Sequence, residues 1–384
     1  MKYYIIAGEA SGDLHGANLM RGLLTHDPSC SIRFWGGGKM AAAGGTLVKD
    51  YRENAVMGAV EVISHLGNIL GNLKFCRQDI LSWKPDAVIL IDYPGFNLRI
   101  ARFAHRHGIK VFYYIPPKVW ARGESRIKML REYVDMTFVI FPFEIPYFKS
   151  KGVKFIYNGN PLVDNIADTP SVRMDRKEFL QSHSLEDDGR EIIALLAGSR
   201  RMEVDYLLPR LVRTVRILRD KTGGRFRFML AAAPSIETDY YNKYLGDDGS
   251  GIDIVSGDTY GVLSHSCAAA ISSGTASLEA AIIGVPQVVC YGMNPITYFL
   301  AKMVVKLDTV SLANMILGRH IFKELLQGDC TPEHIASELL RMCDDISYRD
   351  KMLADYSDMR SMLGEKDSAT RTAADIERLV NRQP

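Results

Sequence analysis

The chain has 384 residues, 47% of them hydrophobic and 24% charged, which predicts a globular protein with two domains rather than one. Its formal net charge of +2 argues against nucleic acid as a partner. No segment approaches the roughly 18 apolar residues of a membrane span, and the apolar run at 3–7 is too short for a signal peptide. The six cysteines form no C-x-x-C pair, which indicates a reducing cytoplasm. We expect no metal and no cofactor, since D-x-D acid pairs are absent too.

Short apolar runs alternate with amphipathic stretches in the first part of the chain. The runs are rich in β-branched and aromatic residues, as buried parallel strands are. We expect strands at 3–7, 31–35, 87–91, 111–115, 137–141 and 154–157. Helical periodicity falls near 13–25, 60–83, 96–107 and 122–131. Alternation of this kind predicts a doubly wound parallel sheet. The glycine-rich segment 35–45 lacks G-x-G-x-x-G spacing and predicts a loop.

The alternation stops and then restarts. Residues 158–170 hold two prolines and no periodicity, and they predict a linker. We expect further strands at 192–197, 226–232, 267–271 and 286–291, and helices near 203–221 and 275–284. Only helices are predicted for 332–382.

The predicted fold class is α/β, with two Rossmann-like, doubly wound parallel-sheet domains that face a cleft. The domains are residues 1–163 and 164–345, and a helical tail follows at 346–384. The tail either returns to the first domain or is exchanged between the subunits of a homodimer.

Two carboxylates follow predicted strands of the first domain. Glu9 lies in the turn Gly8-Glu9-Ala10-Ser11, and Asp92 follows the run AVILI directly. Carboxylates repel phosphate, so this turn does not predict a simple phosphate cradle. A carboxylate at the end of a buried strand is well placed as a general base, although aspartate before a turn also caps helices.

Two strand-end loops of the second domain predict a nucleotide-diphosphate site. The candidate binding residues are Gly198, Ser199, Arg200, Ser273, Gly274, Thr275 and Glu279. Arg200 supplies a forked donor that suits a diphosphate, and Glu279 lies one turn into its helix, where it can accept ribose hydroxyls. Either loop alone is ordinary helix initiation, and the prediction depends on finding two of them in one domain.

Several motifs recur in the order of a known family. They are GEASGDLHGA, VMGAVEV, IDYPGFN, GNPLVD, GSRRMEV, SSGTASLEAA, LAKMVVK, SLANMILGR and KELLQ. Over essentially its whole length the chain resembles the lipid-A-disaccharide synthases. The resemblance implies an inverting, metal-independent glycosyltransferase of the glycosyltransferase-B type, which joins UDP-2,3-diacylglucosamine to 2,3-diacylglucosamine 1-phosphate (lipid X) through a β-1,6 bond and releases UDP. It also implies a cytoplasmic enzyme associated peripherally with the inner membrane of a Gram-negative bacterium.

The resemblance also implies residue roles. Asp92 is similar to the family's proposed base, Arg200 to its diphosphate-binding arginine, and Asn314 to a donor-site asparagine. Glu279 falls on the ribose-binding position, and Glu9 with its turn resembles an acceptor-sugar site, which leaves Glu9 as the second candidate base. Two segments depart from the family pattern: Ala197 replaces a proline, and PPKVWAR at 116–122 replaces S-P-x-V-W-A-W.

Two other readings of the residues stay open. One is another UDP-sugar enzyme of the same fold, either a 2-epimerase or a peptidoglycan glycosyltransferase. The other is a non-catalytic protein that binds a nucleotide or a lipid.

The predicted helix at 60–83 carries more apolar residues than its docking stripe needs. Ile63 and Leu70 lie outside the stripe and predict a lipid or membrane contact, although surplus apolar residues also occur in cores. Residues 99–131 hold nine Lys or Arg against one acid, a local balance of +8. That stretch is either a solvated helix face or a surface for anionic lipid or a phosphorylated substrate.

Overall fold

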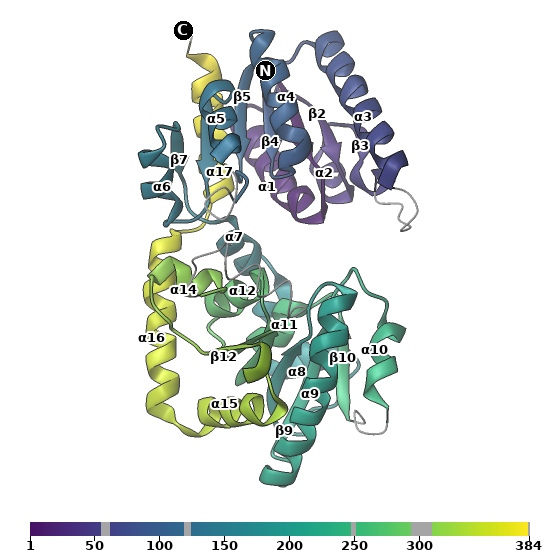
Figure 1. Cartoon of the computed structure of the whole chain (residues 1–384), viewed down its shortest axis with the longest axis vertical. Helices are drawn as coiled ribbons and strands as arrows, with labels where there is room; N and C mark the ends of the chain where they lie inside the picture. Colours follow the sequence, from purple (N-terminus) through teal and green to yellow (C-terminus); the bar gives the residue numbers. More distant parts are fainter. Residues whose placement is uncertain (55–61, 119–123, 247–250, 293–308, 383–384) are drawn as a thin grey trace. The chain divides into compact units, whose positions relative to one another are not determined.

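The computed structural model describes residues 1–54, 62–118, 124–246, 251–292 and 309–382 (Figure 1). The chain forms two compact units, each built around one parallel sheet. The N-terminal unit comprises Met1–Pro161 with Leu363–Pro384, and the C-terminal unit comprises Leu162–Met362. The predicted pair of doubly wound domains is confirmed.

The N-terminal sheet has seven parallel strands. In spatial order they are β3 (Thr46–Asp50), β2 (Ser31–Gly36), β1 (Lys2–Ala7), β4 (Ala87–Ile91), β5 (Lys110–Tyr114), β6 (Met136–Val139) and β7 (Phe155–Tyr157). The order runs outward in both directions from the pair β1 and β4, so this pair is the switch point where doubly wound sheets bind ligands.

Helices cover both faces of this sheet (Figure 1). One face carries α1 (Ala10–His26), α2 (Gly38–Ala43) and α17 (Ser368–Asn381), and the other carries α3 (Val62–Trp83), α4 (Pro94–Arg106) and α5 (Glu124–Tyr133). The remaining elements are η1 (Tyr51–Asn54), α6 (Glu144–Ser150) beside β7, and α7 (Pro161–Ala167) at the boundary of the units. None of the helices in the described ranges is both long and apolar enough to span a bilayer.

A buried polar network fastens α3 to the sheet. The carboxylate of Asp79 accepts from Arg33 at 2.9 and 2.7 Å and from the Tyr4 hydroxyl at 2.8 Å. The Tyr4 oxygen in turn accepts from the indole N–H of Trp35 at 2.9 Å. Hydrogen bonds to a charged group contribute about 1.5–3 kcal/mol each, so this network adds specific attachment to the apolar contacts of the helix.

The C-terminal sheet has six parallel strands. In spatial order they are β10 (Ile252–Ser256), β9 (Phe226–Ala232), β8 (Glu191–Leu196), β11 (Ala268–Ser272), β12 (Gln287–Tyr291) and β13 (Glu324–Leu326). Its switch point lies between β8 and β11, and the topology therefore repeats that of the first sheet.

The C-terminal core lies under α8 (Arg176–Ser182), α11 (Thr259–Ser264) and α12 (Thr275–Ile283). α9 (Arg201–Thr222) packs against α10 (Thr238–Leu245) and α15 (Pro332–Asp344), and α14 (Leu312–Leu317) packs against α12. The unit also holds η2 (Pro170–Val172), η3 (Gln327–Asp329) and α16 (Ile346–Leu363), the last of which ends at the boundary of the units.

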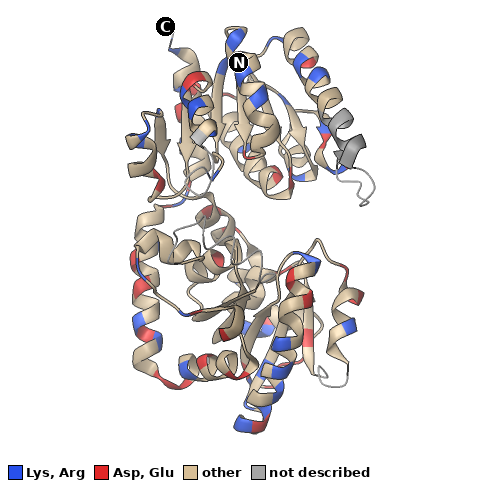
Figure 2. Ribbon diagram, viewed as in Figure 1, with Lys and Arg blue, Asp and Glu red and all other residues tan. Residues whose placement is uncertain are grey.

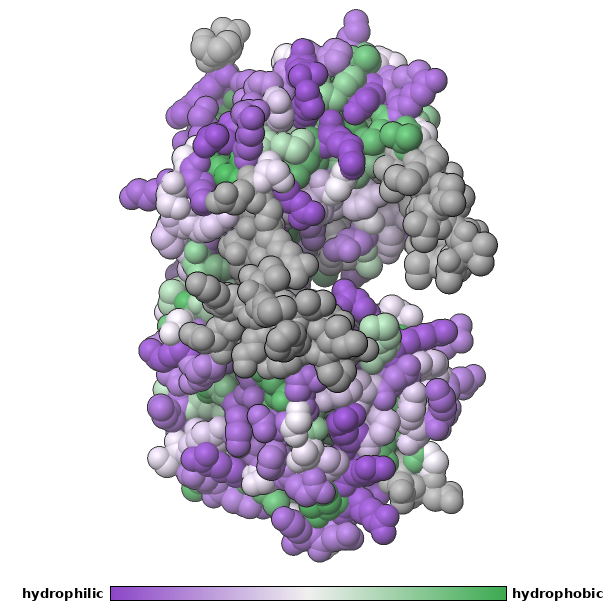
Figure 3. Space-filling model, in the orientation of Figure 1, coloured by the Kyte–Doolittle hydropathy of each residue, from purple (hydrophilic) through white to green (hydrophobic). Residues whose placement is uncertain are grey.

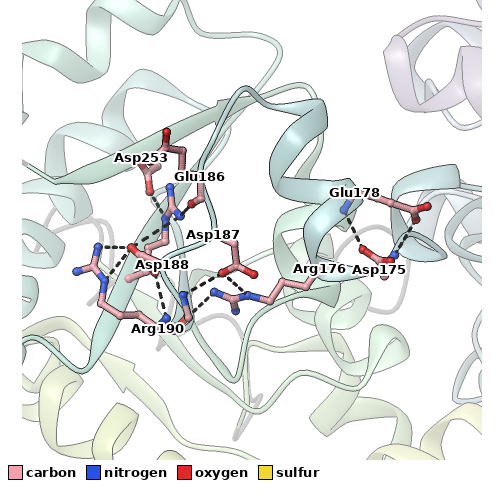
Figure 4. Close-up of polar contacts among 10 residues, drawn as sticks. Asp175, Arg176, Glu178, Glu186, Asp187, Asp188, Arg190 and Asp253 are labelled. Atoms are coloured by element: carbon pink, nitrogen blue, oxygen red, sulfur yellow. Dashed lines mark hydrogen bonds and ion pairs between the residues drawn. The ribbon is translucent and has the colours of Figure 1, made fainter.

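Charged pairs fix the turn that leads into β8 (Figure 4). Arg190 pairs with Asp188 at 2.6 Å, and Arg176 pairs with Asp187 at 2.9 Å while donating to the Arg190 carbonyl at 2.7 Å. The backbone N–H of Gly189 and then Arg176 hold the pKa of Asp187 below its usual value, and Arg190 does the same for Asp188. Such exposed pairs contribute little to stability, and their effect here is to set the path of the chain.

The chain passes from one unit to the other at Pro161–Leu162, inside the predicted linker at 158–170, but this segment is not irregular as expected, because α7 and η2 form there. Pro161 occupies the first position of α7, where proline favours a helix, but seven residues are too few to show a periodicity. The short strands β3, β10 and β13 also have no counterpart among the predicted strands. The ten predicted strands are confirmed, and so are the predicted helices over the described residues; residues 60–61 and 122–123, the expected starts of two helices, lie outside them. The region after residue 332 is helical as expected over the described residues.

The last helix, α17, packs against α1 of the same chain. Close approach depends on Gly22, because a Cβ added there would lie 3.0 Å from the Ala373 Cβ and 3.3 Å from the Ala369 carbonyl. Lys110 holds the far end of the helix by donating to the carbonyls of Leu379 at 2.7 Å and Val380 at 3.0 Å. A cationic group at the C-terminus of a helix stabilises the helix, because it bonds to the carbonyls that have no partner within the helix and interacts favourably with the helix dipole.

Replacement of Gly22 by leucine should separate α17 from α1. Overpacking a tight contact usually costs about 1–3 kcal/mol, so we expect the free energy of unfolding to fall by that amount in thermal denaturation followed by circular dichroism. Gly71→Ala is the matched control, because a Cβ at Gly71 meets nothing within 4 Å and alanine favours the helix. Equal melting temperatures for Gly22→Leu and the parent chain would contradict this packing.

Candidate functional site

Both predicted carboxylates of the N-terminal unit lie at the switch point of its sheet. Ala7 of β1 pairs with Ile91 of β4, so Glu9 and Asp92 leave neighbouring strands at the same edge. Glu9 is the extended N-cap residue of α1, and its exposed carboxylate accepts from the Ser11 hydroxyl at 2.7 Å. This places three of the predicted residues around the ends of two adjacent strands.

The turn after β4 has an unusual backbone. Asp92 and Tyr93 are both left-handed, with φ values of 44° and 46°, although neither is a glycine. Such residues cost about 1–3 kcal/mol each and concentrate at functional sites. The Tyr93 ring lies so close to Gly8 that a Cβ added to Gly8 would be 2.3 Å from it. Glycine at position 8 is thus required by the close approach of this ring.

The environment of Asp92 favours its protonated form more than water does. Burial raises its pKa, the charge of Glu9 raises it further, and the charge of Lys118 opposes them. The N-cap position of α4 belongs to Tyr93, so the Asp92 side chain is not needed as the cap of that helix. A half-buried carboxylate with a raised pKa suits general acid–base chemistry.

The other acid of this first motif has a structural role. Asp13 is buried, and its carboxylate accepts from the backbone N–H groups of Gly37 at 2.7 Å, Lys39 at 3.0 Å and Met40 at 3.0 Å. These bonds organise α2, so the prediction of a loop throughout 35–45 is wrong.

The histidine of the same motif is not charged. Burial lowers the pKa of His15 to about 4, which keeps this side chain neutral near pH 7.

In the C-terminal unit, the loop after β8 is held by Glu203. Its carboxylate accepts from the backbone N–H of Ser199 at 2.9 Å and of Arg200 at 3.3 Å, and from the Arg200 guanidinium at 3.2 Å. Gly198 has a φ of 117°, and a Cβ there would lie 2.4 Å from the Cβ of Glu203. The Arg200 side chain is nonetheless 82% exposed. The loop therefore has a fixed backbone and a cation available to an anionic ligand.

Glu203 is a residue that the sequence prediction missed. Glu203 lies three residues after Arg200, the N-cap of α9, which is the spacing of the glutamate in a capping box, so this spacing was the signal present in GSRRMEV.

The second loop of this unit lies at the end of β11, next to β8. Gly274 is the N-cap of α12 and has a φ of 146°. The residue before it, Ser273, is half-buried, and Thr275, which begins the helix, is exposed. Half-buried Glu279 accepts from the Tyr260 hydroxyl at 3.0 Å, and burial raises its pKa. Tyr260 was not predicted, because 19 residues separate it from its partner and no motif joins them.

Asn314 is buried within the C-terminal unit. Its amide donates to the Glu324 carboxylate at 2.8 Å and accepts from the N–H of Ile321 at 2.9 Å. Glu324 also accepts from the N–H groups of Val310 and Ser311, each at 3.0 Å. Burial alone raises the pKa of Glu324, but the donors around it outweigh burial and lower the pKa overall. Glu324 thus holds the start of α14 and Asn314 ties the helix to Glu324 and Ile321, while direct contact of Asn314 with a donor sugar stays a prediction.

Solved structures place the fold in a class. The UDP-GlcNAc 2-epimerase of Neisseria meningitidis, bound to UDP-GlcNAc, has a TM-score of 0.69 at 13% identity and covers 100% of both chains. MurG of Acinetobacter baumannii has a TM-score of 0.59 at 14% identity and covers 98% of this chain and 99% of that chain. Their likeness shows two parallel-sheet α/β domains of the glycosyltransferase-B type.

Sequence comparisons identify the family. A model of the lipid-A-disaccharide synthetase family matches residues 3–376. The lipid-A-disaccharide synthase of Geobacter sulfurreducens is 38% identical over 379 residues, 99% of this chain and 97% of that protein. The enzyme of that name from Myxococcus xanthus is 36% identical over 378 residues, 98% of this chain and 97% of its own. The chain therefore belongs to the lipid-A-disaccharide synthetase family and is a glycosyltransferase of lipid A disaccharide synthesis.

Proposed function

We propose that this chain transfers 2,3-diacylglucosamine from UDP to the 6-hydroxyl of lipid X. In this reaction the acceptor oxygen attacks the anomeric carbon, the bond from that carbon to the UDP oxygen breaks, and the 6-hydroxyl loses its proton. The anomeric configuration inverts, which gives the β-1,6-linked disaccharide 1-phosphate and UDP. No metal takes part, and the protein must supply a base and a cation.

The observation that carries the proposal is the Glu9 and Asp92 pair at the switch point of the N-terminal sheet. Asp92 takes the proton from the 6-hydroxyl, because it is half-buried and its raised pKa makes it a stronger base than a free aspartate. Glu9, which is more exposed and bonded to Ser11, accepts from hydroxyls of the acceptor sugar with the Gly8 turn beneath it.

The C-terminal unit binds the UDP part of the donor. Arg200 contacts the diphosphate, and the backbone N–H groups at the start of α12, at Gly274–Thr275, face the same ligand. The N–H of Ser199 already donates to Glu203 and serves to hold the loop. Glu279 accepts a ribose hydroxyl on the oxygen that Tyr260 does not use. Each of these groups follows β8 or β11, the two strands at the second switch point.

The alternatives of a 2-epimerase, a peptidoglycan glycosyltransferase or a non-catalytic binding protein are not favoured, because the family assignment covers the whole chain. An assay separates them. UDP release that requires lipid X excludes an epimerase and a binding protein, and loss of turnover with deacylated substrates excludes an enzyme that ignores acyl chains.

Asp92→Asn should abolish turnover while leaving UDP affinity intact. Positioned bases contribute about 10²–10⁴ in rate, so we expect a loss of that size in acceptor-dependent UDP release. In the parent chain kcat/KM should fall as the pH drops through the raised pKa of Asp92, since the base must be ionised, and this limb should lie above the usual aspartate value of about 3.9.

Thermal stability separates this role from a structural one. Because burial disfavours the ionised form of Asp92, a neutral asparagine should keep or raise the melting temperature near pH 7. An unfolded Asp92→Asn protein, or one with parental turnover, would contradict the assignment, and parental turnover would turn attention to Glu9.

Arg200→Ala should reduce kcat by about 10²–10³, the usual effect of removing one donor to developing negative charge. Arg200→Lys should recover only part of this loss, because an ammonium does not form the bidentate fork. Arg213→Ala, an exposed arginine on the same helix, is the matched control and should behave as the parent does. Parental kcat in both Arg200 variants, measured as UDP release, would exclude this role.

We further propose that α3 docks the enzyme peripherally on the inner membrane. Leu70 is 66% exposed, and Leu81 lies three turns further along the same side of α3 at 43% exposure, with exposed Lys74 between them. The side chain of Ile63, the other predicted contact, lies outside the described residues. Figure 3 shows hydrophobic atoms exposed in this part of the N-terminal unit. Lys and Arg recur along α3, α4 and α5 (Figure 2), which adds attraction to anionic headgroups.

Leu70→Ser/Leu81→Ser should weaken binding to vesicles that contain phosphatidylglycerol. Burial of one leucine side chain contributes about 1.5–3 kcal/mol, so even partial insertion of two predicts a loss of tenfold or more in co-sedimentation. Added salt should weaken the binding of the parent chain as well. Ile346→Ser is the matched control, since Ile346 is 62% exposed but belongs to α16. Equal binding by the double variant and the parent would place the docking surface elsewhere.

A further inference from the structure

The backbone carbonyl of Asp92 is held by two buried side chains from other elements. The Tyr113 hydroxyl, on β5, donates to this carbonyl at 2.6 Å, and the Asn97 amide, on α4, donates to it at 2.8 Å. Asn97 also donates to the carbonyl of Ile91 at 3.1 Å. Both Tyr113 and Asn97 have no exposed surface, so these bonds are shielded from water.

The two donors act on a backbone that would otherwise relax. Asp92 and Tyr93 are consecutive left-handed residues, a conformation that persists only where the surroundings enforce it. Tyr93 is packed between Gly8 and Phe96, whose ring centroid is 5.4 Å from its own. The Asp92 carbonyl is bonded on one side and the Tyr93 ring is packed on the other, so the backbone that carries the Asp92 carboxylate is held at both residues of the turn.

Tyr113 is suited to this task across the working range of pH. Burial first, and then the nearby charge of Asp92, raise the pKa of its phenol well above the usual value. The hydroxyl therefore remains a donor wherever the enzyme is active.

We propose that Tyr113 and Asn97 are positioning residues for the glycosyl transfer, which fix the left-handed turn at Asp92 and so aim its carboxylate at the acceptor hydroxyl. This inference rests on the proposed function, in which Asp92 is the base. A displacement of about 1 Å in a reacting group costs up to about 10²-fold in rate, so the loss of one of these bonds affects turnover more than binding.

The test is Tyr113→Phe, which removes one oxygen and keeps the ring in its place. We expect kcat to fall roughly 10- to 100-fold while KM for both substrates changes less than about twofold. The acid limb of kcat/KM should move to lower pH, because a relaxed turn admits water to the Asp92 carboxylate and weakens the effect of burial on its pKa. Glu9 and Lys118, the charged neighbours that act on Asp92, remain unchanged in this variant.

Tyr4→Phe is the matched control. It also removes a buried hydroxyl from a strand of the same sheet, with its 2.8 Å bond to Asp79, but it does not touch the turn. We expect Tyr4→Phe to lower the melting temperature and to leave kcat and the acid limb as in the parent. Equal losses of kcat in the two variants would overturn the proposal, because the effect would then be one of general stability.

A double variant separates this proposal from the assignment of the base. If Tyr113 acts through Asp92, then Tyr113→Phe adds no further loss to the residual rate of Asp92→Asn, whereas a multiplied loss would overturn the proposal. Parental kcat and pH profile in Tyr113→Phe, together with an inactive Asp92→Asn, would overturn the positioning role and leave the base in place. Parental turnover in Asp92→Asn would remove the base itself and the inference with it.

Discussion

The constraint on which the N-terminal site depends is the bonding of backbone carbonyls where β1 and β4 end side by side. These strands are the centre of a sheet that grows outward in both directions, so no crossover helix lies over their ends. Buried backbone carbonyls at such strand ends need hydrogen-bond donors. Asn97 supplies them to Ile91 and Asp92, and Tyr113 adds a second donor to Asp92. These bonds offset the cost of the left-handed turn at Asp92.

In the C-terminal unit the backbone at the switch point is held by a carboxylate instead of by an amide and a hydroxyl. Glu203 accepts from the N–H groups of Ser199 and Arg200 and so fixes the turn after β8, while the Arg200 side chain stays exposed. In both units hydrogen bonds hold the backbone at the switch point, and the side chain assigned to function keeps access to solvent: Arg200 is 82% exposed although it contacts Glu203, and Asp92 is half-buried. This division suits an enzyme, because a fixed backbone lowers the entropy lost on binding while an exposed side chain can reach its ligand.

The direction of the pKa shift separates two uses of buried carboxylates in this protein. Glu324, surrounded by donors, has a lowered pKa and serves as a structural acceptor. Asp92 and Glu279 have raised pKa values because burial is not offset by as many donors. Buried carboxylate oxygens that accept few hydrogen bonds destabilise the folded protein slightly. The same oxygens can accept hydrogen bonds from the hydroxyls of a bound sugar or ribose.

Local sequence was sufficient for most of the strands, the doubly wound class of both sheets and the loops that follow β1, β4, β8 and β11, because apolar runs and the residues after them are neighbours in the chain. The short strands β3, β10 and β13 and the order of the strands were not predicted. The run at 87–91 matches β4, and Asp92 followed from it directly. The contacts that give these residues their properties arise in the folded chain alone. Asp13 acts on α2, which begins 25 residues later, and Tyr113 acts on a carbonyl 21 residues before it. Such pairs carry no periodic signal, and their partners are set by strand order and helix packing rather than by spacing.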